Sequence, residues 1–499
     1  MRNSMEKMTA HELKNAVNGS IYTGSPEAFF RRAVIDSREA GEGDLFFALK
    51  GEKNDGHNFL GQVFSSGCKM AVVSDETKAA EFAGAEGVTM VLVSDTLKAL
   101  QTLGTYYLGK LGLKTRIGVT GSVGKTSTRD FLYYVLSGRY KAARSIKNYN
   151  SETGLPLSIL SFPEDTEAAV IEMGMDFKGS IAVLADIAEP DIAVITNVGI
   201  SHLENFPEEG REGILNTKLE ITKNFNDDSV LVINDDNDML ATVDMKARGI
   251  KGRLVRVGTG ARCDYIVKNV EDNGISGISF DIEHEGETCH VELPVPGAHN
   301  AINGGLAIAV GCLNGMTMQE AAEGFSMTEL TANRLNVIEK DGIVVIDDTY
   351  NAAPDSMKSA IKTLMATPVP EGGRHIAITG DMGELGSESN RGHGEVGAYA
   401  FKMGVDVLIA IGEKSYATYK GWANEASLEG HEIKTANAEG GTPLIVIDGE
   451  TGLAAEYFDN KETVVNGILD HIHKGDCILV KASRAMALET IVKRITDNE

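Results

Sequence analysis

The sequence predicts an α/β protein built from three domains. Its 499 residues exceed the roughly 100–200 residues that one domain usually holds. Short apolar runs alternate with helical stretches along most of the chain, as in parallel sheets covered by helices. One apolar run also leads into a glycine-rich turn and then a helical stretch, near residues 117–136. We expect a small α/β domain (1–112), a central domain with a parallel sheet and a phosphate loop (113–328), and a doubly wound domain (329–499).

The overall composition excludes several classes of protein. The net charge of −25 argues against a nucleic-acid partner, because nucleic-acid-binding proteins carry a basic surface. The five cysteines are scattered and form no C-x-x-C pair, which indicates reduced thiols in a cytoplasmic protein. We expect neither a secretory signal nor a membrane span, since no apolar run approaches about 18–20 residues.

In the first domain we expect a helix over residues 8–17 and another over 97–111. The expected strands are 33–35, 45–48, 70–73 and 89–93. Polar stretches between them contain Ser37, Arg38 and His57, which could bind an anionic group. Spacing alone favours the alternative, that these residues belong to solvated turns.

The stretch Ile117–Ser127 predicts a phosphate-binding loop. An apolar strand is followed by Gly121, Gly124, Lys125 and Thr126, and then by a helical pattern. Such a loop offers backbone N–H groups to phosphate oxygens, while the lysine adds positive charge and the threonine hydroxyl binds Mg²⁺. The two glycines are closer together than in the strict G-x-x-x-x-G-K-[ST] pattern. The alternative is an ordinary strand–turn–helix corner.

Two later strands of the central domain end in side chains that suit a metal site. The strand 168–172 ends at Glu172, and the strand 192–196 leads to His202. Strand ends of a parallel sheet deliver side chains to one ligand-binding edge, and a carboxylate there can hold Mg²⁺ or its waters. The alternatives are an acid in a turn and a structural histidine.

Three further groups in the central domain have less definite roles. Lys218 lies on a helical stretch and, from the residues alone, is a surface lysine. Asn150 belongs to a polar loop bounded by glycine and proline. Residues 262–293 alternate apolar and polar side chains, which predicts an antiparallel ribbon, and Asn300 follows near the start of a helix.

The third domain is predicted to contain a parallel sheet with strands 343–346, 375–379, 407–411, 443–446 and 477–480. Polar side chains gather just past three of these strand ends, which predicts a functional cleft. Residues 421–442 are acidic and contain Gly and Ala, and we expect them to form a solvated insertion.

Together these motifs resemble the ATP-dependent Mur ligases of peptidoglycan synthesis along nearly the whole chain. In chain order they are TGSVGKTS, IEMG, ITNVGISHLE, NTKLEI, PGAHNAIN, NRLNVIEKDGIVVIDDTYN and GDMGELG. The segments DDTYNAAPDSM, GDMGELG and VKASRAM are most similar to the members that add D-alanyl-D-alanine to UDP-N-acetylmuramoyl-tripeptide. The amino-acid-binding D-N-P-R motif of the preceding ligase is missing from the sequence.

The resemblance implies a UDP-substrate domain, a P-loop-type ATPase domain and a Rossmann-like domain, in a monomeric cytoplasmic enzyme. It also implies a mechanism. The tripeptide carboxylate attacks the γ-phosphate of ATP, and the amine of the dipeptide then displaces phosphate from the acyl phosphate. Both steps develop negative charge, so cations placed in advance carry much of the catalysis.

The resemblance further implies roles for individual residues. The catalytic set is Lys125, Lys218, His202 and Glu172, with Lys218 carbamylated, and the metal ligands are Thr126, Glu172, His202 and Lys218. The cofactor-binding set is Gly121, Ser122, Gly124, Lys125, Thr126, Ser127, Asn300, Arg334, Asp348, Tyr350 and Asn351. The substrate-binding set is Ser37, Arg38, His57, Asn150, Lys481, Ser483 and Arg484.

The sequence departs from the family pattern at Val123, Ser151, Ala353 and Gly383, where asparagine, asparagine, asparagine and leucine are usual. None of these changes removes a charged group. Three alternatives remain: a ligase that adds diaminopimelate or lysine, an enzyme like folylpolyglutamate synthase, and a nucleotide-binding scaffold without ligase activity. The segments DSR and DGH in the first domain favour a UDP-sugar substrate over a folate.

Overall fold

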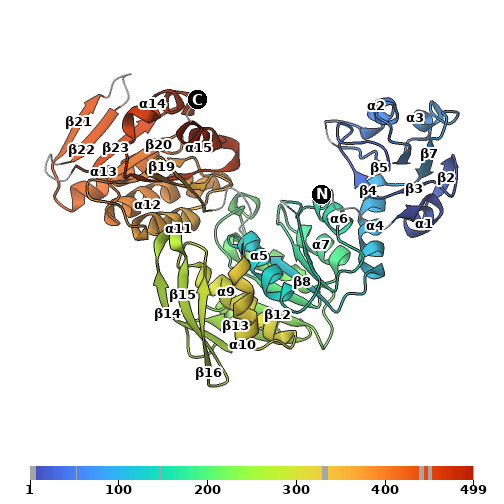
Figure 1. The fold of residues 1–499 in the computed structure, drawn as a ribbon, viewed down its shortest axis with the longest axis horizontal. Helices are drawn as coiled ribbons and strands as arrows, with labels where there is room; N and C mark the ends of the chain where they lie inside the picture. The colour runs from blue at the N-terminus through green and yellow to red at the C-terminus, as the bar shows by residue number, and fades with distance from the viewer. Residues whose placement is uncertain are drawn as a thin grey trace.

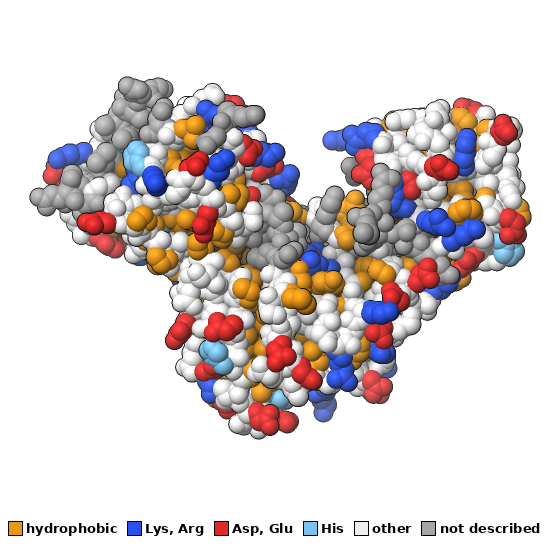
Figure 2. All heavy atoms as spheres, in the orientation of Figure 1, with side chains coloured by type: hydrophobic (Ala, Val, Ile, Leu, Met, Phe, Trp, Pro, Cys, Tyr) orange, Lys and Arg blue, Asp and Glu red, His pale blue; other side chains and the backbone are white. Residues whose placement is uncertain are grey.

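The computed structural model describes residues 7–51, 53–146, 148–328, 335–437, 443–447 and 452–497. The fold is mixed α/β with three large sheets, which confirms the predicted fold class. Figure 1 shows the N-terminal and C-terminal parts at opposite ends of the central part. On the face drawn in Figure 2, acidic side chains are spread over all three parts, in keeping with the negative net charge. Among the residues described, no helix combines the length and the apolar character needed to cross a membrane.

The N-terminal part is a five-stranded sheet with the order β2-β7-β6-β5-β4. Strands β4 to β7 are parallel and correspond to the predicted runs, whereas β2 is an antiparallel edge strand that the sequence analysis missed. The strands are β2 Ser20–Thr23, β4 Arg32–Val34, β5 Asp44–Phe47, β6 Met70–Val73 and β7 Thr89–Leu92. Helices α1 (Ala10–Ala16) and α4 (Thr96–Lys110) lie close to the predicted ranges.

The central part has a nine-stranded sheet with the order β16-β15-β14-β13-β12-β11-β8-β10-β9. Its strands are β8 Thr115–Thr120, β9 Ala142–Arg144, β10 Ala168–Glu172, β11 Ile192–Ile195, β12 Val230–Asn234, β13 Arg253–Gly258, β14 Tyr265–Asp272, β15 Ile278–His284 and β16 Glu287–Leu293. Strands β8 to β13 are parallel. Strands β14, β15 and β16 form the predicted antiparallel ribbon.

Two hydrophobic cores sandwich the central sheet. One face packs on α5 (Lys125–Ser137) and α9 (Asn300–Leu313). The opposite face packs on α4, α6 (Gly154–Ile159), α7 (Ser180–Ala188) and α8 (Gly210–Leu219). Because both faces are covered, β11 and most of β10 and β12 consist of buried Ala, Val, Leu and Ile side chains.

The C-terminal part has an eight-stranded sheet with the order β17-β18-β24-β19-β20-β23-β22-β21. Strands β18, β24, β19, β20 and β23 are parallel, and α11 (Pro354–Ala366) and α12 (Ser389–Lys402) pack against one face. The strands are β17 Asn336–Lys340, β18 Ile343–Asp348, β19 His375–Gly380, β20 Val407–Ile411, β21 Ile433–Asn437, β22 Pro443–Ile447, β23 Ala454–Phe458 and β24 Cys477–Lys481.

Two predictions for this part were wrong. The run 443–446 does form a strand, β22, but it is antiparallel, and β23 occupies the parallel position next to β20. The stretch 421–442 is not a solvated insertion, because α13 (Tyr416–Leu428) and β21 occupy much of it. Trp422 on α13 has no exposed surface. Residues 438–442 lie outside the described part of the chain.

Candidate active site

The phosphate loop follows β8 at the edge of the central sheet where β10, β11 and β12 also end. Its two glycines are required by geometry. A Cβ atom on Gly121 would lie 1.9 Å from the hydroxyl of Thr196, and Gly124 has a φ of 84° beside Asn303. The α5 helix begins at Lys125, so the N–H groups of its first turn have no acceptor within the helix and can bind an anion.

The segment after β11 holds this loop in place. Asn197 Oδ1 accepts hydrogen bonds from the backbone N–H groups of Ser122 (3.0 Å) and Val123 (2.8 Å). Thr196 Oγ1 donates to the carbonyl of Val123 (2.5 Å), and Gly199 N donates to Ser122 Oγ (2.9 Å). The loop is therefore held mainly through its backbone groups, with one further contact at the Ser122 hydroxyl. This explains why valine is tolerated at position 123, since the contacts at that residue do not involve its side chain.

Lys125 and Thr126 point in different directions from the start of α5. Lys125 Nζ donates to the carbonyls of Gly121 (2.8 Å) and Ser122 (3.2 Å), so the ammonium group lies over the loop. Thr126 is buried, and its hydroxyl donates to Glu172 Oε2 (2.9 Å). The structure thus joins the threonine of the loop to the acid at the end of β10.

The carboxylate of Glu172 is 2 % exposed and has three side-chain donors. Besides Thr126, Asn150 Nδ2 donates to Oε1 (2.9 Å) and Arg129 Nη1 donates to Oε2 (3.3 Å). Hydroxyl and carboxylate oxygens are ligands that Mg²⁺ prefers, so Thr126 and Glu172 fit this ion. The sequence analysis did not single out Arg129. The one feature that could have identified it is a charged residue at a helix position that becomes buried.

His202 lies apart from this pair and meets the C-terminal part instead. Its Nδ1 is 2.9 Å from Oε2 of Glu384, and both residues have positive φ angles, 64° and 61°. The hydrogen bond from His202 is the main cause of the lowered pKa of Glu384. No cluster of three or more His, Cys, Asp or Glu side chains suited to a metal occurs among the described residues.

Lys218, on α8, is buried completely, and no acidic side chain of the described residues pairs with it. The sulfur of Met175 lies 3.9 Å from its Nζ. Burial, followed by the positive charge of Lys125, holds the pKa of Lys218 well below its usual value. The side chain is therefore suited to exist as a neutral amine, and it is not the surface lysine that the residues alone suggested.

A cleft between the central and C-terminal parts extends from the phosphate loop. It is lined by residues of the loop and the start of α5 (Ser122, Gly124, Lys125, Ser127), of β12 (Asn234), of the N-cap and first turn of α9 (His299, Asn303) and of the C-terminal part (Asp348, Tyr350, Asn351, Lys481). Lys481 Nζ donates to Asp348 Oδ2 (2.6 Å) and to the carbonyl of Asn351 (2.8 Å). The structure thus brings the predicted nucleotide-binding residues from two domains to one cleft.

Three described residues of the predicted nucleotide-binding set do not line this cleft: Gly121, Thr126 and Asn300. Asn300 is buried and bonds inward, to the carbonyl of Pro296 (2.7 Å) and to Asn303 (3.0 Å). Asn303, one turn further along α9, lies beside Gly124 instead. Arg334 falls outside the described residues.

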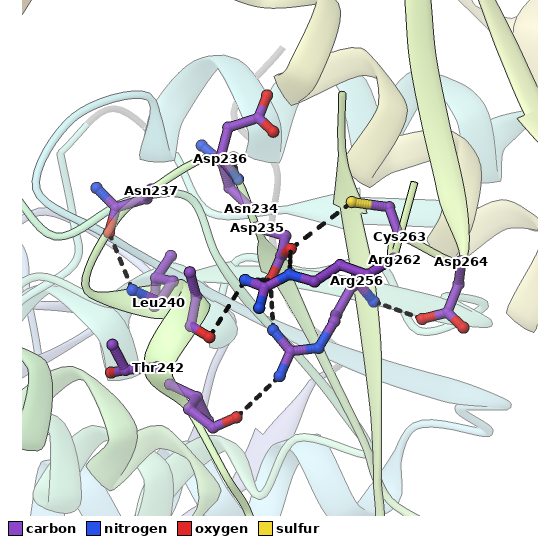
Figure 3. Close-up of polar contacts among 12 residues, drawn as sticks. Asn234, Asp235, Asp236, Asn237, Leu240, Thr242, Arg256, Arg262, Cys263 and Asp264 are labelled. Carbon is purple, nitrogen blue, oxygen red and sulfur yellow. Dashed lines mark hydrogen bonds and ion pairs between the residues drawn. The ribbon is translucent and has the colours of Figure 1, made fainter. Parts of the chain in front are cut away.

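The acidic end of β12 is neutralised by arginines. Figure 3 shows the carboxylate of Asp235 between the guanidinium groups of Arg256 and Arg262. The bond from Arg262 Nε to Asp235 Oδ2 measures 2.5 Å, and only 4 % of the Asp235 side chain is exposed. Asn234 precedes it and lines the cleft, with its Nδ2 donating to the carbonyl of Thr196 (3.0 Å).

The residues predicted to bind the UDP-sugar differ in exposure. Arg38 is 81 % exposed and pairs with Asp36, and Ser37 Oγ lies 3.4 Å from an oxygen of Gln62. His57 is buried, and its ring has protein partners on both sides. Nδ1 is 2.7 Å from Asp55, and Nε2 accepts the N–H of Ser74 (2.9 Å). These contacts account for both ring nitrogens of His57 within the domain.

Past the end of β24, Ser483 and Arg484 are also engaged locally. Ser483 Oγ accepts the N–H of Gly383 (2.7 Å), and Arg484 Nη1 pairs with Glu489 (2.7 Å). A Cβ atom on Gly383 would meet Ser483 Oγ only at 3.5 Å, so nothing steric requires glycine there. Ser151 Oγ accepts the N–H of Gly154 (3.2 Å) at the start of α6, a role that asparagine also performs.

Comparison with known proteins identifies the family. Three family models match in chain order: "Mur ligase family, catalytic domain" over residues 32–107, "Mur ligase middle domain" over 119–311, and "Mur ligase, glutamate ligase domain" over 333–484. A Bacillus subtilis protein named UDP-N-acetylmuramoyl-tripeptide–D-alanyl-D-alanine ligase is 35% identical over 99% of both chains. The chain belongs to the Mur ligase family. The resemblance inferred from the motifs is confirmed.

Solved structures of Mur ligases match along nearly the full length of this Mur ligase chain. MurF from Acinetobacter baumannii is 28% identical, covers 99% of both chains and gives a TM-score of 0.82. The MurF ligase from Thermotoga maritima in complex with ADP is also 28% identical, covers 93% of this chain and 96% of its own, and gives 0.73. These matches confirm the three-domain α/β fold.

Proposed function

We propose that this chain joins D-alanyl-D-alanine to UDP-N-acetylmuramoyl-tripeptide at the expense of ATP, in the assembly of peptidoglycan precursors. The observation that carries the proposal is the full-length match to the Bacillus subtilis ligase of that name. The Escherichia coli ligase of the same name, 27% identical over 99% of both chains, adds support. ADP in the Thermotoga maritima relative supports ATP as the phosphate donor.

The first step transfers the γ-phosphoryl group of ATP to the terminal carboxylate of the tripeptide, giving an acyl phosphate and ADP. The first-turn amides of α5 and the ammonium group of Lys125 bind the phosphates. Gly121, Ser122, Gly124, Thr126 and Ser127 form the rest of this cradle. Thr126 and Glu172 would hold Mg²⁺, which when bound neutralises the charge that develops on the phosphates.

In the second step the amine of D-alanyl-D-alanine attacks the acyl carbon, and phosphate leaves from the tetrahedral intermediate. Lys218 is completely buried. Its neutral amine adds CO₂ and releases a proton, and the resulting carbamate is an anionic group suited to a second Mg²⁺. We further propose His202 as a metal ligand, which requires that its contact with Glu384 opens.

The remaining assignments follow from the cleft. The C-terminal part faces the nucleotide with Asp348, Tyr350 and Asn351, and we propose the same role for Arg334. Asn300 accepts a hydrogen bond from Asn303 and so supports that side chain. We propose that Ser37, Arg38 and His57 belong to the UDP-sugar site, with Asn150, Lys481, Ser483 and Arg484 facing the peptide substrates. We also propose a monomeric state, a cytoplasmic location and the domain boundaries 1–112, 113–328 and 329–499.

Other members of the superfamily are the nearest alternatives. A diaminopimelate-adding ligase structure is 16% identical with a TM-score of 0.51, and a folylpolyglutamate synthase is 14% identical with 0.56. Identities of this size indicate a shared fold alone. A scaffold without catalysis would have no reason to retain Glu172, His202 and Lys218 together.

The decisive experiment is a phosphate-release assay with UDP-N-acetylmuramoyl-tripeptide, ATP and Mg²⁺. We expect phosphate release to depend on D-alanyl-D-alanine and not on single amino acids. Separate assays with the diaminopimelate and lysine forms of the tripeptide identify the third residue. Release that depends on diaminopimelate or glutamate instead would assign the chain to one of the alternatives.

Replacing Lys125 tests the phosphate-transfer step. Lys125→Ala should abolish ATP-dependent phosphate release, because it removes the ammonium group that lies over the loop carbonyls. Lys223→Ala is a matched control, since Lys223 is a half-exposed lysine paired with Asp186. Near-normal turnover of Lys125→Ala would refute this mechanism.

A further inference from the structure

We infer that Arg129 is a positioning residue that orients Glu172 for Mg²⁺. The inference rests on the proposed function only in assuming that this chain binds a nucleotide together with Mg²⁺. Arg129 lies on α5, three residues after Thr126, so the two side chains leave the same face of the helix. Its side chain is 1 % exposed and cannot touch the nucleotide directly.

The guanidinium group of Arg129 has two acidic partners. Its Nε and Nη2 donate to Asp130 Oδ1 at 2.9 and 2.6 Å, and its Nη1 donates to Glu172 Oε2 at 3.3 Å. Asp130 has no exposed surface and is also 3.1 Å from Nη1 of Arg144. Asp130 therefore fixes one edge of the guanidinium group and directs the remaining nitrogen toward Glu172.

The carboxylate of Glu172 is held from three directions. Thr126 and Arg129 donate to Oε2, and Asn150 donates to Oε1. Partners of this kind set the direction of a ligating carboxylate, and their loss typically weakens metal binding by about 10- to 100-fold. Of the three donors, Arg129 brings the positive charge, which allows two buried carboxylates to lie in one small region.

Binding of ADP as a function of MgCl₂ concentration, measured by isothermal titration calorimetry, tests the inference without any turnover. Arg129→Gln can still bond to Asp130 but is too short to reach Glu172. We expect this variant to need about 10- to 100-fold more Mg²⁺ than the native chain for half of the Mg²⁺-dependent gain in ADP affinity. The affinity for ADP without Mg²⁺ should stay unchanged in this variant. A general loss of structure would lower that affinity as well.

Two further variants separate positioning from general support of the network. Arg129→Lys keeps the charge and should fall between the native chain and Arg129→Gln. Arg144→Met, the matched control, removes another partner of Asp130 with no contact to Glu172 and should behave like the native chain. The inference would be overturned if Arg144→Met needed as much additional Mg²⁺ as Arg129→Gln. It would also be overturned if Arg129→Gln had the Mg²⁺ requirement of the native chain, or if the ADP affinity of the native chain did not depend on Mg²⁺.

If Arg129→Gln does not fold, the double variant Arg129→Met/Asp130→Asn replaces it, because no buried aspartate then lacks its partner. The same shift supports the inference and an unchanged Mg²⁺ requirement overturns it. The proposed function is tested separately by phosphate release from the native chain. Failure of that assay together with a Mg²⁺ shift in Arg129→Gln would reject the proposed function and leave the role of Arg129 intact.

Discussion

Two buried lysines of the protein have opposite surroundings. Lys218, in the central part, has no exposed surface, and the sulfur of Met175 is its neighbour at 3.9 Å. Lys481, in the C-terminal part, is 3 % exposed and pairs with Asp348 at 2.6 Å. A buried ammonium group is stable only with a counter-charge. Asp348 supplies this counter-charge to Lys481, whereas burial lowers the pKa of Lys218 and favours its neutral amine.

The difference shows how one residue type serves two kinds of chemistry. A neutral amine is a nucleophile and can be modified covalently, while a paired ammonium group binds anions and orders the loop around it. Lys481 also donates to the carbonyl of Asn351, so it connects β24 to the loop after β18. Lys218 makes no such connection between elements. Burying its side chain without a counter-charge costs free energy of folding, and a functional role accounts for that cost.

The largest effect should come from Lys218. Lys218→Ala should be largely inactive, and short carboxylic acids should restore part of the activity by occupying the place of the carbamate. Phosphate release with and without added acetate or propionate measures this. Lys223→Ala, which changes a half-exposed lysine next to the same helix, should keep its activity and ignore the acids. Full activity of Lys218→Ala without rescue would contradict the carbamate proposal.

Lys481 should affect stability. Lys481→Met leaves Asp348 without its partner, and removal of one member of a buried pair costs about 3 kcal/mol. Trp422 is the single tryptophan, is fully buried and lies in the C-terminal part, so its fluorescence during urea unfolding reports on this domain. The double variant Lys481→Met/Asp348→Asn should regain much of the loss. Equal stability of all three proteins would mean that the pair contributes nothing.

His393, in the C-terminal part, is another buried basic side chain. Its Nε2 accepts the N–H of Met382 (2.9 Å), and its Nδ1 donates to the carbonyl of Ser389 (2.7 Å), so the ring is neutral. Burial is the main cause of its lowered pKa. Below the usual value of 6.5 the unfolded chain takes up a proton that the folded chain resists, so stability should fall as the pH falls through that window.

The stability loss of the C-terminal domain between pH 7 and pH 5.5, again followed by Trp422, should therefore be smaller in His393→Gln than in the native chain. The Gln variant has lower stability at pH 7 because it loses part of the hydrogen bonding. Parallel pH profiles would show that His393 does not titrate on unfolding in this range.

The smallest effect should come from Ala353, at the N-cap of α11. Alanine has no side-chain acceptor for the first turn, although Ser356 Oγ accepts the N–H of Ala353 (3.0 Å). Ala353→Asn restores the family's usual residue and should stabilise the C-terminal domain by about 1 kcal/mol. Ala353→Val is the control, because it adds volume without an acceptor and should give no gain. Thermal unfolding followed by Trp422 measures both variants.

Prediction from sequence succeeded where a local pattern carries the information. The runs that became β6, β10 and β20 match the structure residue for residue, because largely apolar segments bounded by polar ones define buried strands. Prediction failed for β2, β13 and β23, which are short or combine apolar with polar residues. It also mistook α13 for an insertion, because Gly, Ala and acidic residues around Trp422 hide its buried face.

The sequence by itself determined the phosphate loop, the acid at the end of β10 and the order of the motifs, because each depends on neighbouring residues. The tertiary structure alone decided that Asn197 holds the loop, that Arg129 meets Glu172 and that Glu384 meets His202. These contacts join residues 75, 43 and 182 positions apart (384 minus 202 for the last pair). The physical reason is that side-chain charge is visible in a sequence, whereas burial and the partner that compensates it arise only when distant segments pack together.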